Sequence, residues 1–474
     1  MVMARMFPAL CFACLLGLGC GRGTPEAVVA VLEPGPPPAA AGSRPDILLI
    51  SIDTLRADHL GAYGYARSTS PFLNRLAAGS ALFERAYAHA SWTPPSVASL
   101  FTSLYPPQHG SLGKDNLILD DRNQTLAETL GAAGYYAAAY SASPFIHPDF
   151  GFGQGFRRFG FEPSDQAGRL AALVERELPA LRRAYPRAPL FVYVMFFDPH
   201  FPYAPPPPYD SRFNADGGRP SFDPRRVTRV GSLFALGATV GRDTFEYLRA
   251  EYDGEIACAD AALAELLARF ERGELGLDPA RTVLVLTADH GEEFLEHAGF
   301  GHGNALYEES IRVPLLIREP GRSEGARIPS VVRQVDVFPT LLELAGLQPR
   351  PGLEGRSLVG LLDGVPEPDR PAFASSLHLF HQGESQRSLR QGDLKLIVVR
   401  NPDRAELYDL RRDPEESHNL AGERPEALAR MAVELDALER RLRPVAAPAA
   451  GGAGGSRSSE RSLDLLRSLG YIQK

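Results

Sequence analysis

Short apolar runs alternate with longer amphipathic segments along most of the chain. Each apolar run has the pattern of a strand covered on both faces, as a parallel sheet requires; the runs are Ile47–Ile52, Leu190–Phe197 and Thr282–Thr287. Helical patterns lie between them, at Leu126–Ala133, Arg169–Ala184 and Phe245–Phe270. This alternation predicts an α/β fold, with a doubly wound, mostly parallel sheet flanked by helices and ligands bound at the carboxyl ends of the strands.

The C-terminal part of the chain has a different pattern of predicted helices and strands. A helix at Val335–Ala345 closes the main domain, which we expect to span residues 45–365. A hairpin at Ser388–Arg400, a strand at Glu406–Leu410 and a helix at Pro425–Leu442 predict a small α+β subdomain over residues 366–445. Residues 446–474 are expected to form a Gly/Ser-rich linker and a short terminal helix.

The first twenty residues have the pattern of an export signal. Arg5 precedes an apolar run from Phe7 to Leu18, which is too short to span a bilayer comfortably. The run leads into Gly-Leu-Gly-Cys, which resembles a lipoprotein cleavage site although Gly17 stands where Leu or Val is usual. We therefore expect lipidation of Cys20, with simple secretion or a retained anchor as alternatives. Residues 21–44 are rich in Pro and Ala and predict a tether, so the protein is expected in the cell envelope, the periplasm or the medium.

The charge of the chain limits the class of partner that it can bind. The net charge of −8 and the pI near 5.8 argue against nucleic acid as a partner, since no basic stretch is dense enough to follow a phosphate backbone.

Of the four cysteines, two lie in the signal and one is Cys20, which leaves Cys258 as a lone thiol expected to pack in the core. The mature chain is thus expected to have no disulfide.

Four segments carry candidate chemistry, and at least three of them follow a predicted strand. Asp53 ends the first strand, where a buried carboxylate is costly unless it meets a cation, although it could instead cap a helix. Thr93 precedes two prolines and a new helix, a position that favours bound anions but also begins ordinary helices. His200 lies between prolines after the second strand. The fourth segment holds Asp289 and His290, which can share a metal if the backbone turns sharply, followed by His297 and His302.

Longer motifs accompany these residues. They are Thr93–Thr102 with Tyr105–Gly110, Ala288–Glu292, Tyr307–Pro314, Val335–Leu342, and the C-terminal pieces Leu407–Leu410, Asp413–Glu416 and Asn419–Leu420. Together they resemble the nucleophile helix, the second metal motif, the next strand, the closing helix and the C-terminal segment of the sulfatase-type domain of the alkaline phosphatase superfamily. The resemblance covers about four-fifths of the chain, and its main part runs from Asp46 to about Gly346.

Two departures from the sulfatase pattern change the expected chemistry. A sulfatase of this family begins the nucleophile motif with Cys or Ser, which is oxidised to formylglycine, and has Arg four positions later. Here those positions hold Thr93 and Val97. The methyl group of threonine would make any oxidised product a ketone, so the formylglycine mechanism is not expected. A threonine here instead resembles the phosphotransferases and phosphodiesterases of the superfamily.

The resemblance implies one divalent metal ion held by Asp53, Thr93, Asp289 and His290. Because a histidine is included, Zn²⁺ or Mn²⁺ is favoured, with Ca²⁺ or Mg²⁺ as alternatives. It further implies that Thr93 attacks an anionic ester, phosphate mono- or diesters being favoured.

The remaining histidines complete the expected site. His200 and His302 resemble the substrate-side His and Lys positions of the family, and the resemblance implies oxyanion stabilisation and leaving-group protonation for them; His297 is a further candidate near the substrate. His59 and His109 are expected to be structural. Two alternatives stay open: a sulfuric ester hydrolase without formylglycine, and an inactive cell-surface scaffold. The natural substrate and the oligomeric state are not indicated.

Overall fold

A nine-stranded sheet forms the centre of the part of the chain that the structure describes. The computed structural model describes residues 27–35, 43–112, 117–164, 166–214, 242–322, 324–377, 385–401 and 403–442. From one edge to the other the strands are β1 (Val28–Val31), β5 (Arg158–Phe161), β4 (Tyr136–Ser141), β6 (Leu190–Phe196), β2 (Asp46–Ile52), β7 (Thr282–Ala288), β10 (Arg312–Arg318), β3 (Ala81–Tyr87) and β11 (Ala326–Arg333). Only β1 and β10 pair antiparallel with their neighbours. The predicted mostly parallel sheet is therefore confirmed.

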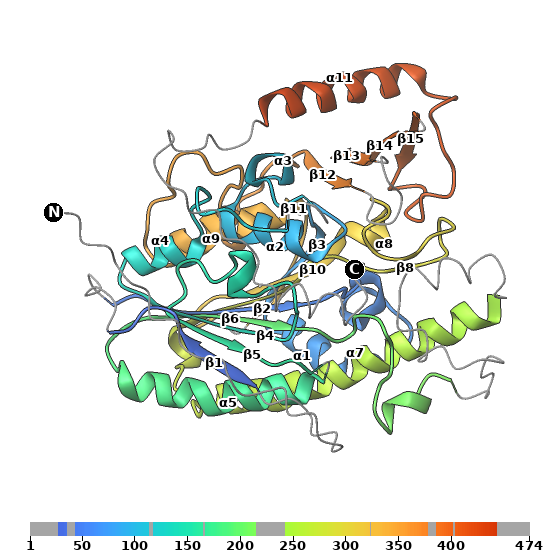
Figure 1. Cartoon of the computed structure of the whole chain (residues 1–474). Coiled ribbons are helices and arrows are strands. Elements are labelled where there is room, and N and C mark those ends of the chain that lie inside the picture. The colour runs from blue at the N-terminus through green and yellow to red at the C-terminus, as the bar shows by residue number, and fades with distance from the viewer. Residues whose placement is uncertain are drawn as a thin grey trace.

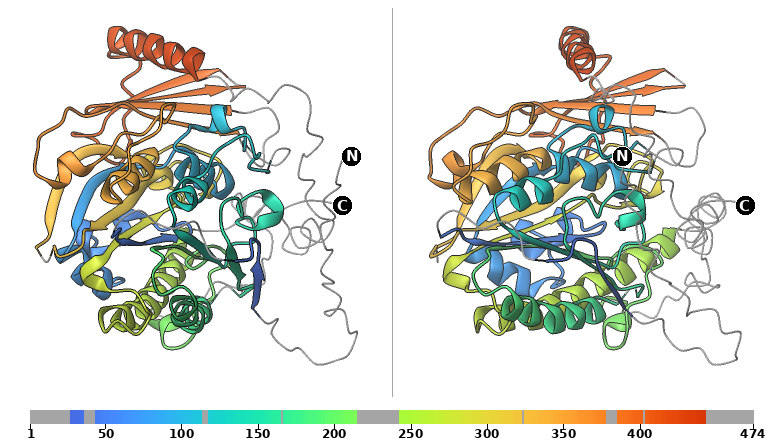
Figure 2. Two further views of the ribbon diagram at one scale, coloured as in Figure 1. Left: turned by 90° about the vertical axis from the view of Figure 1, so that its left-hand side faces the viewer. Right: turned by 60° about the vertical axis from the view of Figure 1, so that its left-hand side comes forward.

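Helices cover both faces of this sheet (Figures 1 and 2). On one face lie α1 (Pro71–Ala78), α5 (Ala167–Ala184) and α7 (Arg242–Glu271), and on the other lie α2 (Thr93–Thr102), α4 (Leu126–Ala132) and α9 (Val337–Leu344). Every residue of β2, β4, β6 and β7 is buried. Covered strands of this kind explain the continuous apolar runs that predicted three of the four.

A smaller antiparallel sheet forms the predicted C-terminal subdomain. Its strands are β12 (Ala372–Leu377), β13 (Ser385–Gln391), β14 (Leu394–Arg400) and β15 (Arg404–Asp409), and α11 (Pro425–Arg441) packs on them. The subdomain lies on the side of the main sheet that carries α2 and α9 (Figure 2). Tyr105 and Val335 of the main domain belong to the same apolar cluster as Leu396 and Met431, so the two units share a core.

The structure corrects several boundaries. Within the predicted tether, Val28–Val31 pairs with β5 as an edge strand, so the tether interpretation is wrong for these four residues. The motif at Tyr307–Pro314 begins with a short helix, α8 (Glu308–Ile311), and its strand starts only at Arg312. Cys258 is half-buried rather than fully packed in the core. The signal with Cys20, the terminal linker and helix, and residues 215–241 of the loop after His200 lie outside the described residues.

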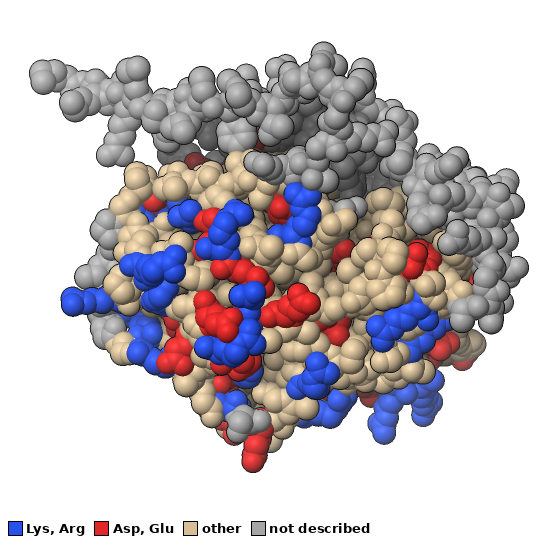
Figure 3. All heavy atoms as spheres, turned by 90° about the horizontal axis from the view of Figure 1, so that it is seen from below, with Lys and Arg blue, Asp and Glu red and all other residues tan. Residues whose placement is uncertain are grey.

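The outer face of α5 and α7 carries acidic and basic side chains side by side (Figure 3). Arg269 of α7, for example, lies 3.2 Å from Glu175 of α5. Among the helices that the structure describes, none has the length and apolar character needed to cross a bilayer.

Candidate active site

The candidate residues follow three neighbouring parallel strands and lie at one edge of the sheet. The pairing aligns Ile52 of β2 with Phe196 of β6 on one side and with Ala288 of β7 on the other. The next residue after β2 is Asp53 and the next after β7 is Asp289, while His200 follows β6 by four positions. The predicted meeting of these segments at the carboxyl ends of the strands is therefore what the structure shows.

A tight turn holds Asp289 beside His290. The next residue, Gly291, passes so close to another segment that a Cβ atom would lie 1.9 Å from the carbonyl oxygen of Glu309, and only glycine fits. The Oδ1 atom of Asp289 accepts hydrogen bonds from the backbone N–H groups of Thr54 (3.1 Å) and His290 (2.8 Å). These two bonds fix the carboxylate and leave Oδ2 directed to other groups.

The tautomer of the neutral His290 ring follows from its contacts. Its Nδ1 atom lies 2.8 Å from the carbonyl oxygen of Gly291. A carbonyl oxygen can only accept, so Nδ1 carries a hydrogen, and in the neutral ring the lone pair is then on Nε2. Nε2 lies 3.4 Å from Oδ2 of Asp289 and 3.7 Å from Oδ1 of Asp53. The imidazole lone pair thus faces the same point as two carboxylates.

Helix α2 brings Thr93 to this point. Thr93 is the first residue of the helix, and its Oγ1 lies 3.1 Å from Nε2 of His290 and 3.4 Å from Oδ1 of Asp53. The start of α2 is fastened to the end of β7, because Oγ of Ser96 lies 2.5 Å from the carbonyl oxygen of Asp289. Gln334 adds a hydrogen bond of 2.9 Å to the carbonyl oxygen of Ala288. The hydroxyl is therefore held by the packing of two elements.

The cluster has the composition of a cation site. One ligand atom from each of Asp53, Asp289 and His290 lies within 4.8 Å of the other two, and all three residues are buried. Among the described residues, Oδ2 of Asp53 and Oδ2 of Asp289 are buried without a hydrogen-bond partner. Burial raises the pKa of Asp53 well above its usual range, and the charges of Asp289 and Glu292 add to the effect. A bound cation would compensate these charges, so the residues fit the predicted metal.

Two further candidates adjoin the cluster. The ring of His302 lies 4.7 Å from that of His290 and 4.9 Å from that of His200. Burial, followed by the charge of His302, lowers the pKa of His200 to about 3. Nδ1 of His302 lies 2.8 Å from Oε1 of Glu292, whose pKa burial raises to about 7. Glu292 was not assigned a role from the sequence, although it is the last residue of the motif Ala288–Glu292.

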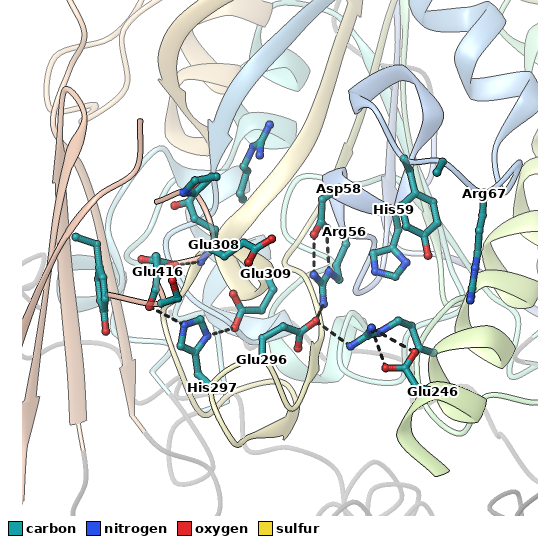
Figure 4. A pocket seen from close by; sticks show the side chains of 18 of the residues that line it. Arg56, Asp58, His59, Arg67, Glu246, Glu296, His297, Glu308, Glu309 and Glu416 are labelled. Atoms are coloured by element: carbon teal, nitrogen blue, oxygen red, sulfur yellow. Dashed lines mark hydrogen bonds and ion pairs between the residues drawn. The ribbon is translucent and has the colours of Figure 1, made fainter. Parts of the chain in front are cut away.

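The structure shows the partners of His297, whose predicted role near the substrate stays a prediction. Nδ1 of His297 lies 2.6 Å from Glu309, and Nε2 lies 3.1 Å from the carbonyl oxygen of Glu416. Its ring stacks on Tyr307 with the centroids 3.6 Å apart. Figure 4 shows His297 between Glu309 and Glu416 in the wall of a cavity that Arg56 also lines. Both ring nitrogens of His297 therefore have partners within the protein.

The two histidines predicted to be structural lie in packed positions. Nδ1 of His59 is 2.7 Å from Oδ1 of Asp253, and Nε2 of His109 is 3.1 Å from Oγ of Ser99. Both rings are buried, and burial lowers the pKa of His109 to about 3. Among the described residues, no hydrogen bond joins either histidine to Asp53, Asp289 or His290.

Comparison with known proteins agrees with this geometry. A family model described as Sulfatase matches residues 45–347, and a model of the C-terminal part of N-sulphoglucosamine sulphohydrolase matches residues 282–442. Arylsulfatase K of Mus musculus is 35% identical over 188 residues, which are 38% of this chain and 33% of the relative. The match thus spans about a third of that relative's length.

Two longer matches extend over most of the chain. The multifunctional alkaline phosphatase superfamily protein PehA of Trinickia caryophylli is 25% identical over 478 residues, covering 80% of this chain and 92% of the relative. The crystal structure of the phosphonate monoester hydrolase of Agrobacterium radiobacter shares the fold, with a TM-score of 0.68 at 24% identity over 84% of this chain and 96% of that one. Because the Sulfatase model includes the strand ends and the helix that build the site, and spans more than half of the chain, the chain belongs to the sulfatase family.

Proposed function

We propose that this protein is a metal-dependent hydrolase or transferase that acts on an anionic ester, with Thr93 as the nucleophile and phosphate mono- or diesters as the favoured substrates. The observation that carries the proposal is the position of the Thr93 hydroxyl, 3.1 Å from Nε2 of His290 and 3.4 Å from Oδ1 of Asp53, at the first residue of a helix. A nucleophile must lie next to the group that activates it, and a helix N-terminus favours the approach of an anion.

Sulfatase family members depend on divalent metal ions, and the buried Asp53, Asp289 and His290 offer such an ion two oxygen ligands and one nitrogen ligand. Thr93 would be a fourth ligand. A divalent cation bound there supplies positive charge that makes a nearby hydroxyl more acidic and offsets the negative charge of the ester. The imidazole favours Zn²⁺ or Mn²⁺ over the harder Ca²⁺ and Mg²⁺.

The side chains of the chain itself account for the remaining steps. The Thr93 hydroxyl donates to Oδ1 of Asp53, which is therefore placed to take its proton. The threonine oxygen forms a bond to phosphorus as the bond between phosphorus and the ester oxygen breaks, which gives a phosphothreonine. His302 protonates the departing oxygen from its imidazolium form. His200 lies against the phosphoryl oxygens; because its Nδ1–H donates to the carbonyl oxygen of Phe201, its Nε2 donates to them only in the imidazolium form, which the charge of a bound phosphate ester favours. Water or an acceptor alcohol then releases the phosphate from Thr93.

Phosphate is favoured over sulfate because of the residues that this chain lacks. Thr93 cannot yield the aldehyde of formylglycine, and Val97 leaves no charged side chain one helical turn further along α2. A sulfuric ester remains the second candidate, because relatives such as arylsulfatase K carry that activity in their name. Both candidates use the same nucleophile and the same metal ligands.

A panel of generic substrates tests the proposal. The purified protein should be assayed on aryl phosphate, aryl phosphodiester and aryl sulfate esters with Mn²⁺, Zn²⁺ or Ca²⁺. We expect turnover of a phosphate ester with Mn²⁺ or Zn²⁺, and a phosphorylated Thr93 in the mass spectrum after acid quench. Preference for the sulfate ester would favour the second candidate. Absence of turnover on every ester with every metal would contradict both and support an inactive scaffold.

We further propose that the protein is exported and held at a membrane by a lipid on Cys20. The support is the short apolar run that ends in Gly-Leu-Gly-Cys. Wild-type protein should fractionate with membranes, and Cys20→Ser should release it or leave the signal uncut. Wild-type protein found entirely in the soluble fraction would contradict the lipid anchor.

A further inference from the structure

A buried carboxylate contacts one of the proposed catalytic histidines on the side away from the metal ligands. Oε1 of Glu292 lies 2.8 Å from Nδ1 of His302, ten residues further along the chain. The two residues flank a small hairpin whose strands are β8 (Glu293–Phe294) and β9 (Phe300–Gly301), with Glu293 paired to Gly301. Because the hairpin closes between them, the two side chains meet at its base.

The backbone on the Glu292 side is held by two other segments. Its N–H donates to the carbonyl oxygen of Glu309 at 3.1 Å, and its carbonyl oxygen accepts a hydrogen bond of 2.9 Å from Arg56. On the other side, the N–H of Gly303 donates to the carbonyl oxygen of Ser91 at 2.6 Å. Ser91 stands two residues before Thr93. The fold therefore sets the distance between the carboxylate of Glu292 and the imidazole of His302. It also ties this pair to the segment that carries Thr93, the proposed nucleophile.

The carboxylate of Glu292 has no guanidinium partner in the described part of the chain. The nearby Arg56 gives its side-chain N–H groups to the backbone of Glu292 and to Glu296 and Asp58 instead. A buried carboxylate that serves only the fold is normally paired with a cation. The carboxylate of Glu292 instead lies 2.8 Å from Nδ1 of His302, and it also interacts with the hydroxyl of Tyr203. Its contact with His302 therefore acts directly on that ring.

We propose that Glu292 is a positioning residue for His302. An imidazole has two nitrogens on opposite edges, and occupation of Nδ1 by the carboxylate leaves Nε2 for the substrate. Glu292 then fixes the orientation of the ring, so that the departing oxygen of the ester meets Nε2 rather than a carbon edge. This inference rests on the proposed function, because it concerns the proton that His302 gives to the leaving group.

The dependence of kcat on the leaving group distinguishes a residue that positions a general acid from a residue that only supports the fold. An ester with a poor leaving group needs the proton, whereas one with a good leaving group departs largely without it. We expect Glu292→Ala to lower kcat on phenyl phosphate on the order of 100-fold, and to lower kcat on 4-nitrophenyl phosphate far less. Glu292→Gln keeps a hydrogen-bond acceptor beside Nδ1 and should recover much of the lost rate on phenyl phosphate.

The neighbouring Glu293 provides a matched control. It is also buried, and its carboxylate accepts a hydrogen bond from the N–H of Gly299 instead of contacting His302. The substitutions Glu293→Ala and Glu293→Gln should leave the ratio of the two rates as in the wild type. Bound metal, measured per chain, should be the same in the Glu292 variants and the wild type.

A double variant completes the test. If Glu292 acts through His302, the variant Glu292→Ala with His302→Gln should be no slower than His302→Gln alone. Equal losses on both esters in the Glu292 variants, or a further loss in the double variant, would overturn the positioning role while leaving the proposed function intact. A wild-type protein that turns over no ester at all would instead overturn the proposed function and this inference with it.

Discussion

Oγ1 of Thr93 lies 3.1 Å from Nε2 of His290, although 197 positions separate the two residues in the sequence. The contact exists because α2 begins where β7 ends. Ser96 of α2 hydrogen-bonds to the carbonyl oxygen of Asp289, and Gln334 bridges the two elements through its contacts with Ser96 and with the carbonyl oxygen of Ala288. It places the hydroxyl among the ligand atoms of Asp53 and Asp289 rather than at the surface. A hydroxyl held in this way is a testable nucleophile.

Replacement of the hydroxyl should abolish turnover without unfolding the protein. We expect Thr93→Ala to lower kcat by at least about a thousandfold, because loss of a nucleophile removes the covalent step. Thr93→Ser should retain part of the activity, since it keeps the oxygen and loses only a methyl group. Thr93→Cys should not create an efficient sulfatase, because Val97 stands in the Arg position of the maturation motif.

Thr102, the last residue of the same helix, is the matched control for these variants. Its hydroxyl donates to the carbonyl oxygen of Ala98 at 2.7 Å and takes no part in the cluster. Thr102→Ala should keep wild-type kcat. If Thr93→Ala turned over the best substrate at the wild-type rate, the nucleophile would have to be a water molecule instead.

Metal binding should depend on the carboxylates at the ends of the strands. We expect Asp289→Ala to reduce the divalent metal content after dialysis from one ion per chain to a small fraction, because it removes one of three buried ligands. Asp53→Ala should do the same. Elemental analysis of the dialysed proteins provides the measurement.

A carboxylate at the other end of β2 serves as the control. Asp46 begins the strand that leads to Asp53, and it pairs with Arg182 at 2.7 Å. Asp46→Ala is expected to lower stability yet keep the metal. Full metal content in both Asp289→Ala and Asp53→Ala would show that the ion, if one binds, is held by other residues.

The sequence reveals strands whose composition matches their burial, and it misses the others. β6 and β7 are continuous apolar runs and are predictable. β4 has the sequence Tyr-Ala-Ala-Ala-Tyr-Ser, without a β-branched residue, so only its two neighbours in the sheet make it a strand. β1 lies in a Pro/Ala-rich range and is a strand because β5 offers it an open edge.

In the candidate site, too, some residues can be predicted from the sequence and others cannot. Asp53 and Asp289 are predictable because each directly follows a buried strand, and parallel strands end at one edge. His297 could not be separated from His302 by spacing. Leu295 and Ala298 have positive φ angles of 69° and 65°, which turn the hairpin so that its tip faces Glu309 and Glu416. A turn of that kind has no signal in the sequence, because neither residue is glycine.

The environment of His297 predicts a pH-dependent contribution to stability. Burial alone would lower its pKa, but the hydrogen bond and charge of Glu309 outweigh burial and raise the pKa to about 9. An unfolded histidine titrates near about 6.5. A pKa that is higher in the folded state gives stability that is fully present below about pH 6.5 and is lost as the pH rises through about 9. Tm should therefore fall over this range, and less steeply in His297→Gln.

Other groups near His297 must be considered in that experiment. Burial raises the pKa of Glu293 to about 8, which gives a loss of stability in the same direction in both proteins. His418, exposed and paired with Glu423 at 2.7 Å, is the control, and His418→Gln should reproduce the wild-type profile. Identical slopes for wild type and His297→Gln would contradict the assigned interaction with Glu309.

A buried ion cluster between the two domains predicts the largest change in stability. Nζ of Lys395 in β14 lies 3.1 Å from Glu308 of α8 and 3.0 Å from Glu416, and both Lys395 and Glu416 are fully buried. Lys395→Met keeps the length of the side chain but leaves two carboxylates without their cation. We expect a loss of about 3–5 kcal/mol in the free energy of unfolding, measured by urea denaturation with circular dichroism.

The exposed pair of Arg441 and Glu354, at 2.8 Å, sets the scale for comparison. Arg441→Met should cost less than about 1 kcal/mol, because water already screens that pair. Adding Glu416→Gln to Lys395→Met should recover part of the loss, since it removes one of the unpaired charges. If Lys395→Met cost no more than Arg441→Met, the ion cluster would contribute little to the contact of α8 with β14. The apolar cluster of Tyr307, Ile397 and Val399 would then carry that contact.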